Sequence, residues 1–227
     1  MSTILVVAAH PDDELLGVGA TIAKHIKNGD EAYALILGEG QTSRTNTREE
    51  TDQSVVADLH KDSVAASKVI GFKDIFFENF PYNRFDQVDL LDIVKAVEKY
   101  VAKIKPDIIY THHRGDLNVD HQYTCRAVMT GTRPVNNCCV KEIYCFETVS
   151  STEWNFSYGD EAFTPDTFVD VEDTFEVKIE AMKHYKSELC EFPHPRSLEN
   201  LEICAKRWGA VTGKKYVEAF ETLRVIR

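Results

Sequence analysis

The chain has 227 residues, 43% of them apolar, and its 26 lysines and arginines against 37 aspartates and glutamates give a net charge of −11. At this length a folded chain buries roughly 70–75% of the surface that its unfolded form exposes, so it needs no disulfide or metal ion to build a core. Low proline and glycine contents exclude a long disordered or collagen-like tract, and the acidic charge argues against a nucleic-acid binder that neutralises phosphates.

The amino-terminal part of the chain alternates between apolar runs and helical patterns. Residues 4–9 form an apolar run without alternation, which is typical of a strand covered on both faces in a parallel sheet. Apolar side chains recur with a helical period over residues 15–27. A second strand is predicted over residues 31–37, followed by a glycine turn, and a second helix over residues 58–71.

The same alternation continues through the middle of the chain. Residues 75–77 predict a third strand, and residues 88–104 predict a long helix with apolar side chains on one face. Residues 107–110 predict a fourth buried strand, which ends in a polar run over residues 111–121. We therefore expect a doubly wound, Rossmann-like α/β fold with a mostly parallel sheet and helices on both faces.

The pattern changes beyond Pro134. It predicts one strand, a turn-rich segment and two helices, at residues 140–148, 154–168, 173–185 and 198–211. Neither a linker nor an internal repeat separates this part from the rest. We therefore expect a single domain over residues 1–227, in which a Rossmann-like part (1–133) carries a carboxyl-terminal part (134–227) that packs on it and rims the site.

Cysteine usage and the apolar segments point to an intracellular protein. The six cysteines have neither a CxxC pair nor the density of a small secreted scaffold, so reduced thiols are expected. No apolar run approaches the ~18–20 residues of a membrane span, and no basic region precedes the first apolar stretch. We expect a cytoplasmic protein with no membrane span and no nucleic-acid partner; a homo-oligomer stays open.

Metal-capable side chains follow two of the predicted strands, at the point where each strand ends. The first cluster is His10, Asp12, Asp13 and Glu14, and the second is His112, His113, Asp116, Asp120 and His121. Open α/β sheets bind ligands at the carboxyl ends of their strands. A catalytic zinc ion takes about three protein ligands, so two from the first cluster and one from the second would suffice.

Within the first cluster, His10 and Asp13 are the natural pair of ligands because their i, i+3 spacing brings both to one side of a turn. Asp12 points differently and can stay unligated. A metal ion that activates water needs a base to take the proton, and a free carboxylate beside the ligands suits that role. The alternative is that the acids only cap a helix and the histidines are hydrogen-bonded polar groups. Two such clusters after neighbouring strands favour the metal site.

Other segments offer weaker candidates for binding a substrate. The glycine turn at residues 38–40 could cradle a sugar or phosphate, or be a simple turn. An anionic group would need arginines, for which Arg44, Arg48, Arg196 and the basic stretch 206–227 are available; surface salt bridges and a solvated face are the alternatives. The aromatic residues Trp154, Phe156 and Tyr158 could stack on a sugar ring or pack on the core.

The run Ala9-His10-Pro11-Asp12-Asp13-Glu14 resembles the signature of the PIG-L/LmbE superfamily of zinc-dependent N-deacetylases. These enzymes act on N-acetylglucosaminyl groups in phosphatidylinositol, mycothiol and bacillithiol precursors and related amino sugars. Residues 116–121 resemble the second motif of the family, and residues 195–197 and 217–221 resemble the carboxyl-terminal segment of bacterial members. The resemblance thus spans nearly the whole chain.

The resemblance implies roles for individual residues. It implies Zn²⁺ as the cofactor, with His10, Asp13 and His121 as its ligands. It makes Asp12 the general base that later protonates the leaving amine, and Asp120 a carboxylate that supports a neighbouring catalytic group.

This chain departs from the family pattern at Asn118, where many members have a histidine assigned to oxyanion stabilisation or proton transfer. An asparagine can donate a hydrogen bond to an oxyanion but cannot shuttle a proton. Either Asp12 does all the acid–base work, or His112 or His113 substitutes. The resemblance also places His194, beside Arg196, near the site.

We therefore expect a hydrolase that removes the acetyl group from an N-acetylated amino sugar or sugar conjugate, nucleotide-linked ones included. The substrate-binding candidates are Arg44, Arg48, His112, His113, His194 and Arg196. The alternatives are a metal-dependent amidase acting on a non-sugar natural-product amide, and a metal- or sugar-binding module without turnover. An unligated carboxylate at Asp12 argues against the last, because a structural metal site has no use for it.

Overall fold

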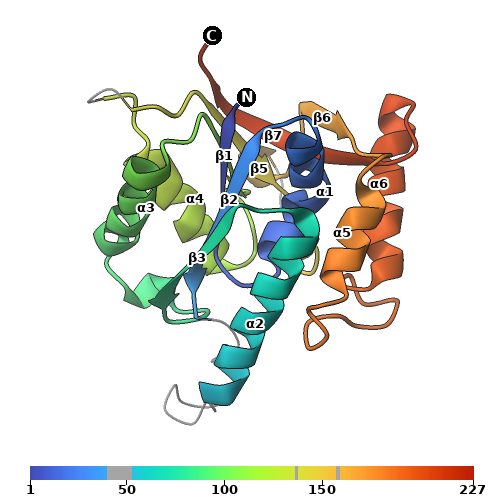
Figure 1. Cartoon of the computed structure of the whole chain (residues 1–227), viewed down its shortest axis with the longest axis horizontal. Helices are drawn as coiled ribbons and strands as arrows, with labels where there is room; N and C mark the ends of the chain where they lie inside the picture. Colours follow the sequence, from blue (N-terminus) through green and yellow to red (C-terminus); the bar gives the residue numbers. More distant parts are fainter. Residues whose placement is uncertain (40–52, 136–137, 157–158) are drawn as a thin grey trace.

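A seven-stranded sheet lies between two layers of helices in this computed structural model, which describes residues 1–39, 53–135, 138–156 and 159–227 (Figure 1). The strand order is β3-β2-β1-β4-β5-β7-β6. The strands are β1 (Thr3–Ala8), β2 (Glu31–Gly38), β3 (Asp74–Phe80), β4 (Ile108–His112), β5 (Glu142–Phe146), β6 (Thr167–Asp170) and β7 (Val217–Val225). The first five are parallel to one another, and β7 runs antiparallel to both β5 and β6. This confirms the predicted mostly parallel α/β sheet.

Helices cover both faces of the sheet. The face with α3 (Leu90–Ile104) and α4 (Val119–Gly131) is opposite the face with α1 (Asp13–Lys27), α2 (Gln53–Ile70), α5 (Phe175–Met182) and α6 (Leu198–Thr212) (Figure 1). Short 3₁₀ turns lie at η3 (Phe85–Gln87), η4 (Thr152–Asn155) and η5 (Gly159–Glu161).

The central strand β1 supplies apolar side chains to both cores. Ile4 and Val6 pack with α1 and α2, whereas Leu5 and Val7 pack with α3 and α4, because successive side chains of a strand point to opposite faces. All four are fully buried. Each contributes about 1.5–3 kcal/mol by leaving water. The apolar run at residues 4–9 is therefore unbroken because both faces of β1 are buried, as the sequence predicted.

Helix α1 approaches the sheet closely at Gly17. A Cβ atom at this position would lie 2.1 Å from the ring of Phe146 on β5. Only glycine allows this approach, which sets the depth at which α1 lies against the strands.

Three elements were not predicted: α4, β6 and β7. The start of α4 buries Asp120 and His121 instead of apolar side chains, so its sequence lacks the apolar stripe of a surface helix. Strand β7 was hidden in the basic stretch 206–227, which was expected to be a solvated face or a phosphate-facing rim. It pairs between β5 and β6, and Val217 and Phe220 are buried there.

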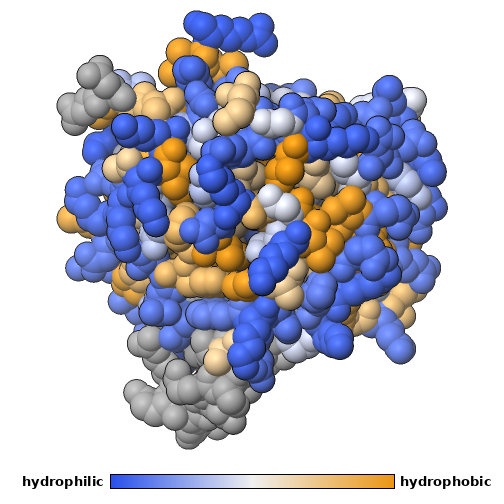
Figure 2. Space-filling view, in the orientation of Figure 1, coloured by the Kyte–Doolittle hydropathy of each residue, from blue (hydrophilic) through white to orange (hydrophobic). Residues whose placement is uncertain are grey.

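The face of the molecule seen in the orientation of Figure 1 is mainly polar. Figure 2 shows hydrophilic side chains over most of one face, with apolar ones in smaller patches between them. Among the described residues, none of the helices combines the length and the apolar character needed to cross a membrane.

Candidate active site

A cavity of about 170 Å³ opens at the carboxyl ends of β1 and β4. Its walls come from the turn between β1 and α1, from the start of α4, and from the carboxyl-terminal part of the chain. The lining residues used below are His10, Asp12, Asp13, Tyr82, Asn118, His121, Trp154, Glu188, His194 and Arg196. The two sequence clusters thus meet as expected, because parallel strands end at the same edge of the sheet.

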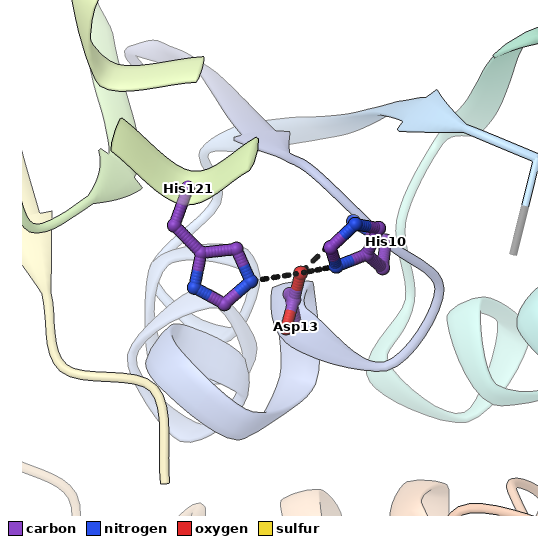
Figure 3. Close-up of side chains that lie close together, drawn as sticks. All are labelled: His10, Asp13 and His121. Carbon is purple, nitrogen blue, oxygen red and sulfur yellow. Dashed lines mark hydrogen bonds and ion pairs between the residues drawn. The ribbon is translucent and has the colours of Figure 1, made fainter. Parts of the chain in front are cut away.

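His10, Asp13 and His121 point toward one another in this cavity (Figure 3). Asp13 Oδ2 lies 3.4 Å from His10 Nδ1 and 3.3 Å from His121 Nε2. One potential ligand atom from each residue lies within 4.8 Å of the other two, and all three residues are buried. Two imidazoles and a carboxylate are a donor set that divalent transition metals accept.

The surroundings of His121 test whether this triad fits a metal ion. Its Nε2 is buried and has no hydrogen-bond partner, although Asp13 is close. Burial alone would lower the pKa of His121, but the carboxylates of Asp13 and Asp116 raise it to about 10. An unsatisfied buried nitrogen in a strongly negative environment is costly, and a cation bound there would relieve both problems. The triad therefore fits a metal site.

Each histidine of the triad has a second carboxylate beside the ring nitrogen that faces away from Asp13. His10 Nε2 donates to Asp120 Oδ2 at 2.8 Å, and Asp120 also accepts the backbone N–H groups of Asn83 and Phe85. His121 Nδ1 lies 3.1 Å from Asp116 Oδ1. Such outer carboxylates fix the tautomer and the ring orientation of metal-binding histidines.

The turn from His10 to Glu14 explains how adjacent acids reach different places. The backbone N–H of His10 donates to Asp13 Oδ2 at 2.9 Å, which folds the side chain of Asp13 back over the turn. Asp12 has φ of 96°, in the left-handed region that favours glycine. The backbone N–H of Asp12 donates to Glu14 Oε2 at 3.0 Å. The turn is therefore fixed by its own carboxylates.

Asp12 lines the cavity but stays outside the triad. It is only 4% exposed, and its Oδ2 atom has no hydrogen-bond partner. Arg196 Nη1 lies 3.6 Å from that atom. Burial, followed by the charges of Asp13 and Glu188, raises the pKa of Asp12 well above its ordinary value. This carboxyl group can therefore take up a proton within the cavity.

Asn118 is both a lining residue and the N-cap of α4. Its side-chain oxygen accepts the backbone N–H of Asp120 at 2.9 Å, and its side-chain nitrogen donates to Asn83 Oδ1 at 2.8 Å. The amide group is therefore held in a fixed orientation at the edge of the cavity.

His112 and His113 are not among the residues that line the cavity, although His112 Nε2 lies 3.4 Å from Asp13 Oδ2. His112 Nε2 accepts the backbone N–H of Ala9, and its ring stacks on His121 with the centroids 3.9 Å apart. Burial lowers the pKa of His112 well below its ordinary value, which keeps it neutral. His113 is committed to Glu221 Oε2 at 2.6 Å and to the carbonyl of Glu161. Both rings are used in holding elements together.

Some of the arginine and aromatic candidates line the cavity, and others do not or lie outside the described residues. Arg196 and His194 line the cavity, and Arg196 Nη1 donates to Glu188 Oε2 at 2.9 Å. Trp154 also lines it and lies edge-on to His194. Phe156 is 75% exposed and does not line the cavity. Arg44, Arg48, Tyr158 and the end of the glycine turn lie outside the described residues.

The basic stretch 206–227 does not reach the cavity. Its lysines pair with nearby acids instead: Lys206 with Glu202, Lys214 with Asp170 and Lys215 with Glu172. The interpretation of this stretch as a phosphate-facing rim is therefore wrong for the lysines, because they lie against β6 and α6.

The sequence analysis did not single out several of the lining residues, among them Tyr82 and Glu188. Tyr82 follows the carboxyl end of β3, and its ring packs against His10 with the centroids 4.2 Å apart. The rule that parallel strands end at one edge could have found it. Glu188, which is 4% exposed, lies in a turn after α5, where no sequence pattern marked it.

Comparisons with known proteins agree with this geometry. Residues 5–131 match the family model PIG-L, described as GlcNAc-PI de-N-acetylase. The chain is 30% identical over 190 residues to the uncharacterized deacetylase YaiS of Escherichia coli K12, which covers 81% of this chain and 90% of YaiS.

Solved structures share the fold. The N,N'-diacetylchitobiose deacetylase of Pyrococcus horikoshii, in complex with its inhibitor MPG, has a TM-score of 0.78 and 20% identity, over 98% of this chain and 84% of that one. The zinc-inhibited form of teicoplanin deacetylase Orf2 has a TM-score of 0.76 and 15% identity, over 97% of both chains.

Proposed function

The chain belongs to the PIG-L/LmbE family of metal-dependent N-deacetylases, which are hydrolases of linear amides, and we propose that it removes the acetyl group from a neutral N-acetylated amino sugar. The observation that carries this proposal is the separation of Asp12 from the triad. Three donors converge on one point, while a fourth side chain, the carboxylate of Asp12, has an unpartnered oxygen and faces the same cavity. A site that only stored a metal ion would not need that group.

We assign the metal to His10, Asp13 and His121, and we propose zinc. Two histidines and one carboxylate are a common ligand set of catalytic zinc. A deacetylase with this fold binds zinc, although zinc inhibits that enzyme. A bound ion of this kind polarises an amide carbonyl and makes water more acidic. Asp116 and Asp120 hold the two imidazoles in the required orientation.

The acid–base work falls to Asp12. Its carboxylate takes the proton of the attacking water and later donates it to the nitrogen of the leaving amine. The raised pKa of Asp12 suits both steps, because a carboxyl group with an ordinary pKa would hold the transferred proton too weakly. Arg196 at 3.6 Å stabilises the charged form between turnovers.

Asn118 is the side chain that we propose as a donor to the developing oxyanion. A side-chain amide has two N–H groups, and Asn118 uses one of them for Asn83. The second is available at the edge of the cavity. Because the amide is already fixed by the N-cap bond, it needs no reorganisation when charge develops.

The walls of the cavity favour a neutral sugar. Its volume of about 170 Å³ is below the ~300–1,000 Å³ of pockets for drug-sized ligands, so it suits an acetamido group and the ring that carries it. Trp154 offers an aromatic face, and Glu188 and Arg196 offer polar groups for hydroxyls. Among the described lining residues, Arg196 is the one permanent cation, and Glu188 and Asp12 already neutralise it.

The test is acetate release by the zinc-loaded protein from a panel of substrates. The panel contains N-acetylglucosamine, diacetylchitobiose, a phosphorylated and a nucleotide-linked N-acetylglucosamine, and a simple non-sugar N-acetyl amine. We expect release from the neutral sugars, and a loss of about 10²–10⁴-fold in kcat for Asp12→Asn with unchanged zinc content.

Two outcomes would contradict the proposal. Release from the non-sugar amide alone would make the protein an amidase of another class. Loss of zinc from Asp12→Asn would make Asp12 a ligand and remove it as the base.

A further inference from the structure

The backbone at Asp12 adopts a conformation that its side chain does not explain. Asp12 combines φ of 96° with ψ of −30°, although it is not a glycine. It occupies the N-cap position of α1, yet its side chain makes no capping hydrogen bond. Something other than ordinary helix capping must therefore hold this residue in place.

Glu14 supplies that restraint. Its Oε2 accepts the backbone N–H of Asp12 at 3.0 Å, and its Oε1 accepts the O–H of Tyr185. Glu14 and Tyr185 are both fully buried, and Tyr185 belongs to the apolar cluster between α1, α2 and α5. A carboxyl group is costly in such a place unless both of its oxygens are bonded, as they are here.

The direction of these bonds matters for Asp12. Rotation about φ would move the peptide N–H of Asp12 away from Glu14 and would swing the carboxylate of Asp12 at the same time. The N–H bond to Glu14 therefore fixes where that carboxylate points.

We infer that Glu14 and Tyr185 are positioning residues, which hold Asp12 in its left-handed conformation so that its carboxylate faces the cavity beside the triad. This inference rests on the role proposed above for Asp12. Tyr185 follows α5, 171 residues after Glu14, so the carboxyl-terminal part of the chain fixes the amino-terminal turn.

The first experiment compares Tyr185→Phe with Tyr110→Phe. Both substitutions delete a buried tyrosine hydroxyl and keep the ring, but Tyr110 bonds to His25 at 3.0 Å and does not line the cavity. We expect Tyr185→Phe to lower kcat by about 10–100-fold, with KM and zinc content unchanged, because a displaced base acts poorly. Tyr110→Phe should keep full kcat. Full kcat in Tyr185→Phe would overturn the inference.

A second comparison separates positioning from a general loss of structure. In the Asp12→Asn background no base remains to be positioned, so Tyr185→Phe should cause no further loss of kcat. An equal loss in both backgrounds would show that Tyr185 acts on the site as a whole and would overturn the inference. Failure of the proposed function looks different, since the wild-type protein would then release no acetate or Asp12→Asn would stay fully active.

A measurement that needs no substrate completes the test. The backbone amide of Asp12 should exchange its hydrogen slowly in the wild-type protein, and about 10-fold or more faster in Tyr185→Phe and in Glu14→Leu, whose side chain has no acceptor for that N–H group. The amide of Ala9, which donates to His112, is the internal reference and should keep its rate. An unchanged exchange rate at Asp12 in both variants would overturn the inference.

Discussion

Three consecutive acidic residues at the start of α1 have three different environments. Burial raises the pKa of Asp13, but the charges of His121 and His112 outweigh it and bring that pKa well below its ordinary value. Burial raises the pKa of Asp12, and it raises that of Glu14 to about 7. Successive residues at a helix start point in different directions, so each acid meets different partners.

At the same scale, Asp120 should control how tightly the triad binds zinc. Asp120→Asn removes the charge that orients His10, so we expect the zinc affinity to fall by about 10–100-fold. Competition with a chelator measures this affinity. Asp107→Asn is the control, because Asp107 accepts a backbone N–H of Thr3 at the other end of the sheet. Equal affinities in Asp120→Asn and the wild-type protein would contradict this role.

The residues that converge in the cavity could be predicted in part. His10, Asp12 and Asp13 were identified because they share one short turn, and their grouping needs only local geometry. His121 and Asp120 required the family resemblance in addition. Glu188 and Tyr185 could not be predicted, because they reach the site only through the packing of α5, which no local pattern encodes.

Among the elements, the parallel strands were the easiest to predict. The apolar runs of β1, β2 and β4 have no polar interruptions because helices cover both of their faces. Strand β7 was harder, since its buried run 217–220 includes Glu218 and is followed by Glu221, and both acids are partners of side chains on other elements. Its pattern resembled a surface segment for that reason.

The ion pair between His113, after β4, and Glu221, on β7, should make the stability depend on pH. Burial lowers the pKa of His113, but Glu221 raises it overall, whereas the pKa of Glu221 is lowered by His113 against the effect of burial. The contribution of His113 to the free energy of unfolding is full below 6.5, its pKa in the unfolded chain. This contribution is lost as the pH rises through the higher pKa of His113 in the folded protein. The contribution of Glu221 to the free energy of unfolding is full above 4.5, its pKa in the unfolded chain. It is lost as the pH falls through the lower pKa of Glu221 in the folded protein.

Between these limits both groups are charged, so Glu221→Gln should destabilise the protein most near pH 5.5, by about 1–3 kcal/mol. The loss should be smaller at alkaline pH, above the raised pKa of His113, where the imidazole has lost its charge. Urea denaturation at both pH values measures the free energy of unfolding. A loss independent of pH would show that the charges of this pair do not contribute.

The contact between α1 and β5 leads to a prediction about Gly17. Alanine normally stabilises a helix by about 1 kcal/mol relative to glycine. Here its Cβ would meet Phe146 at 2.1 Å, so we expect Gly17→Ala to lower the free energy of unfolding by about 1–3 kcal/mol. The same substitution in a Phe146→Leu background should cost less, because the ring is gone. A stabilised Gly17→Ala would contradict the packing described here.

At the scale of the whole molecule, the cavity is assembled from segments that are far apart in the sequence. Its walls come mainly from the turn after β1, the segment after β3, the start of α4, the segment after β5 and the turns after α5. The metal triad needs only the first and third of these. The rest of the cavity wall comes mostly from the other segments, so motifs in the sequence predicted the triad but not the residues that would select a substrate.

The insertion of β7 between β5 and β6 has a consequence for synthesis on the ribosome. Among the described strands, β6 pairs only with β7, and β5 has an open edge until β7 arrives. The nascent polypeptide emerges amino end first, so residues 217–225 reach the sheet after every other strand has left the exit tunnel. During that interval the edge of β5 can pair with other chains. A chaperone that shields this edge during translation would raise the yield of active enzyme without touching the finished protein.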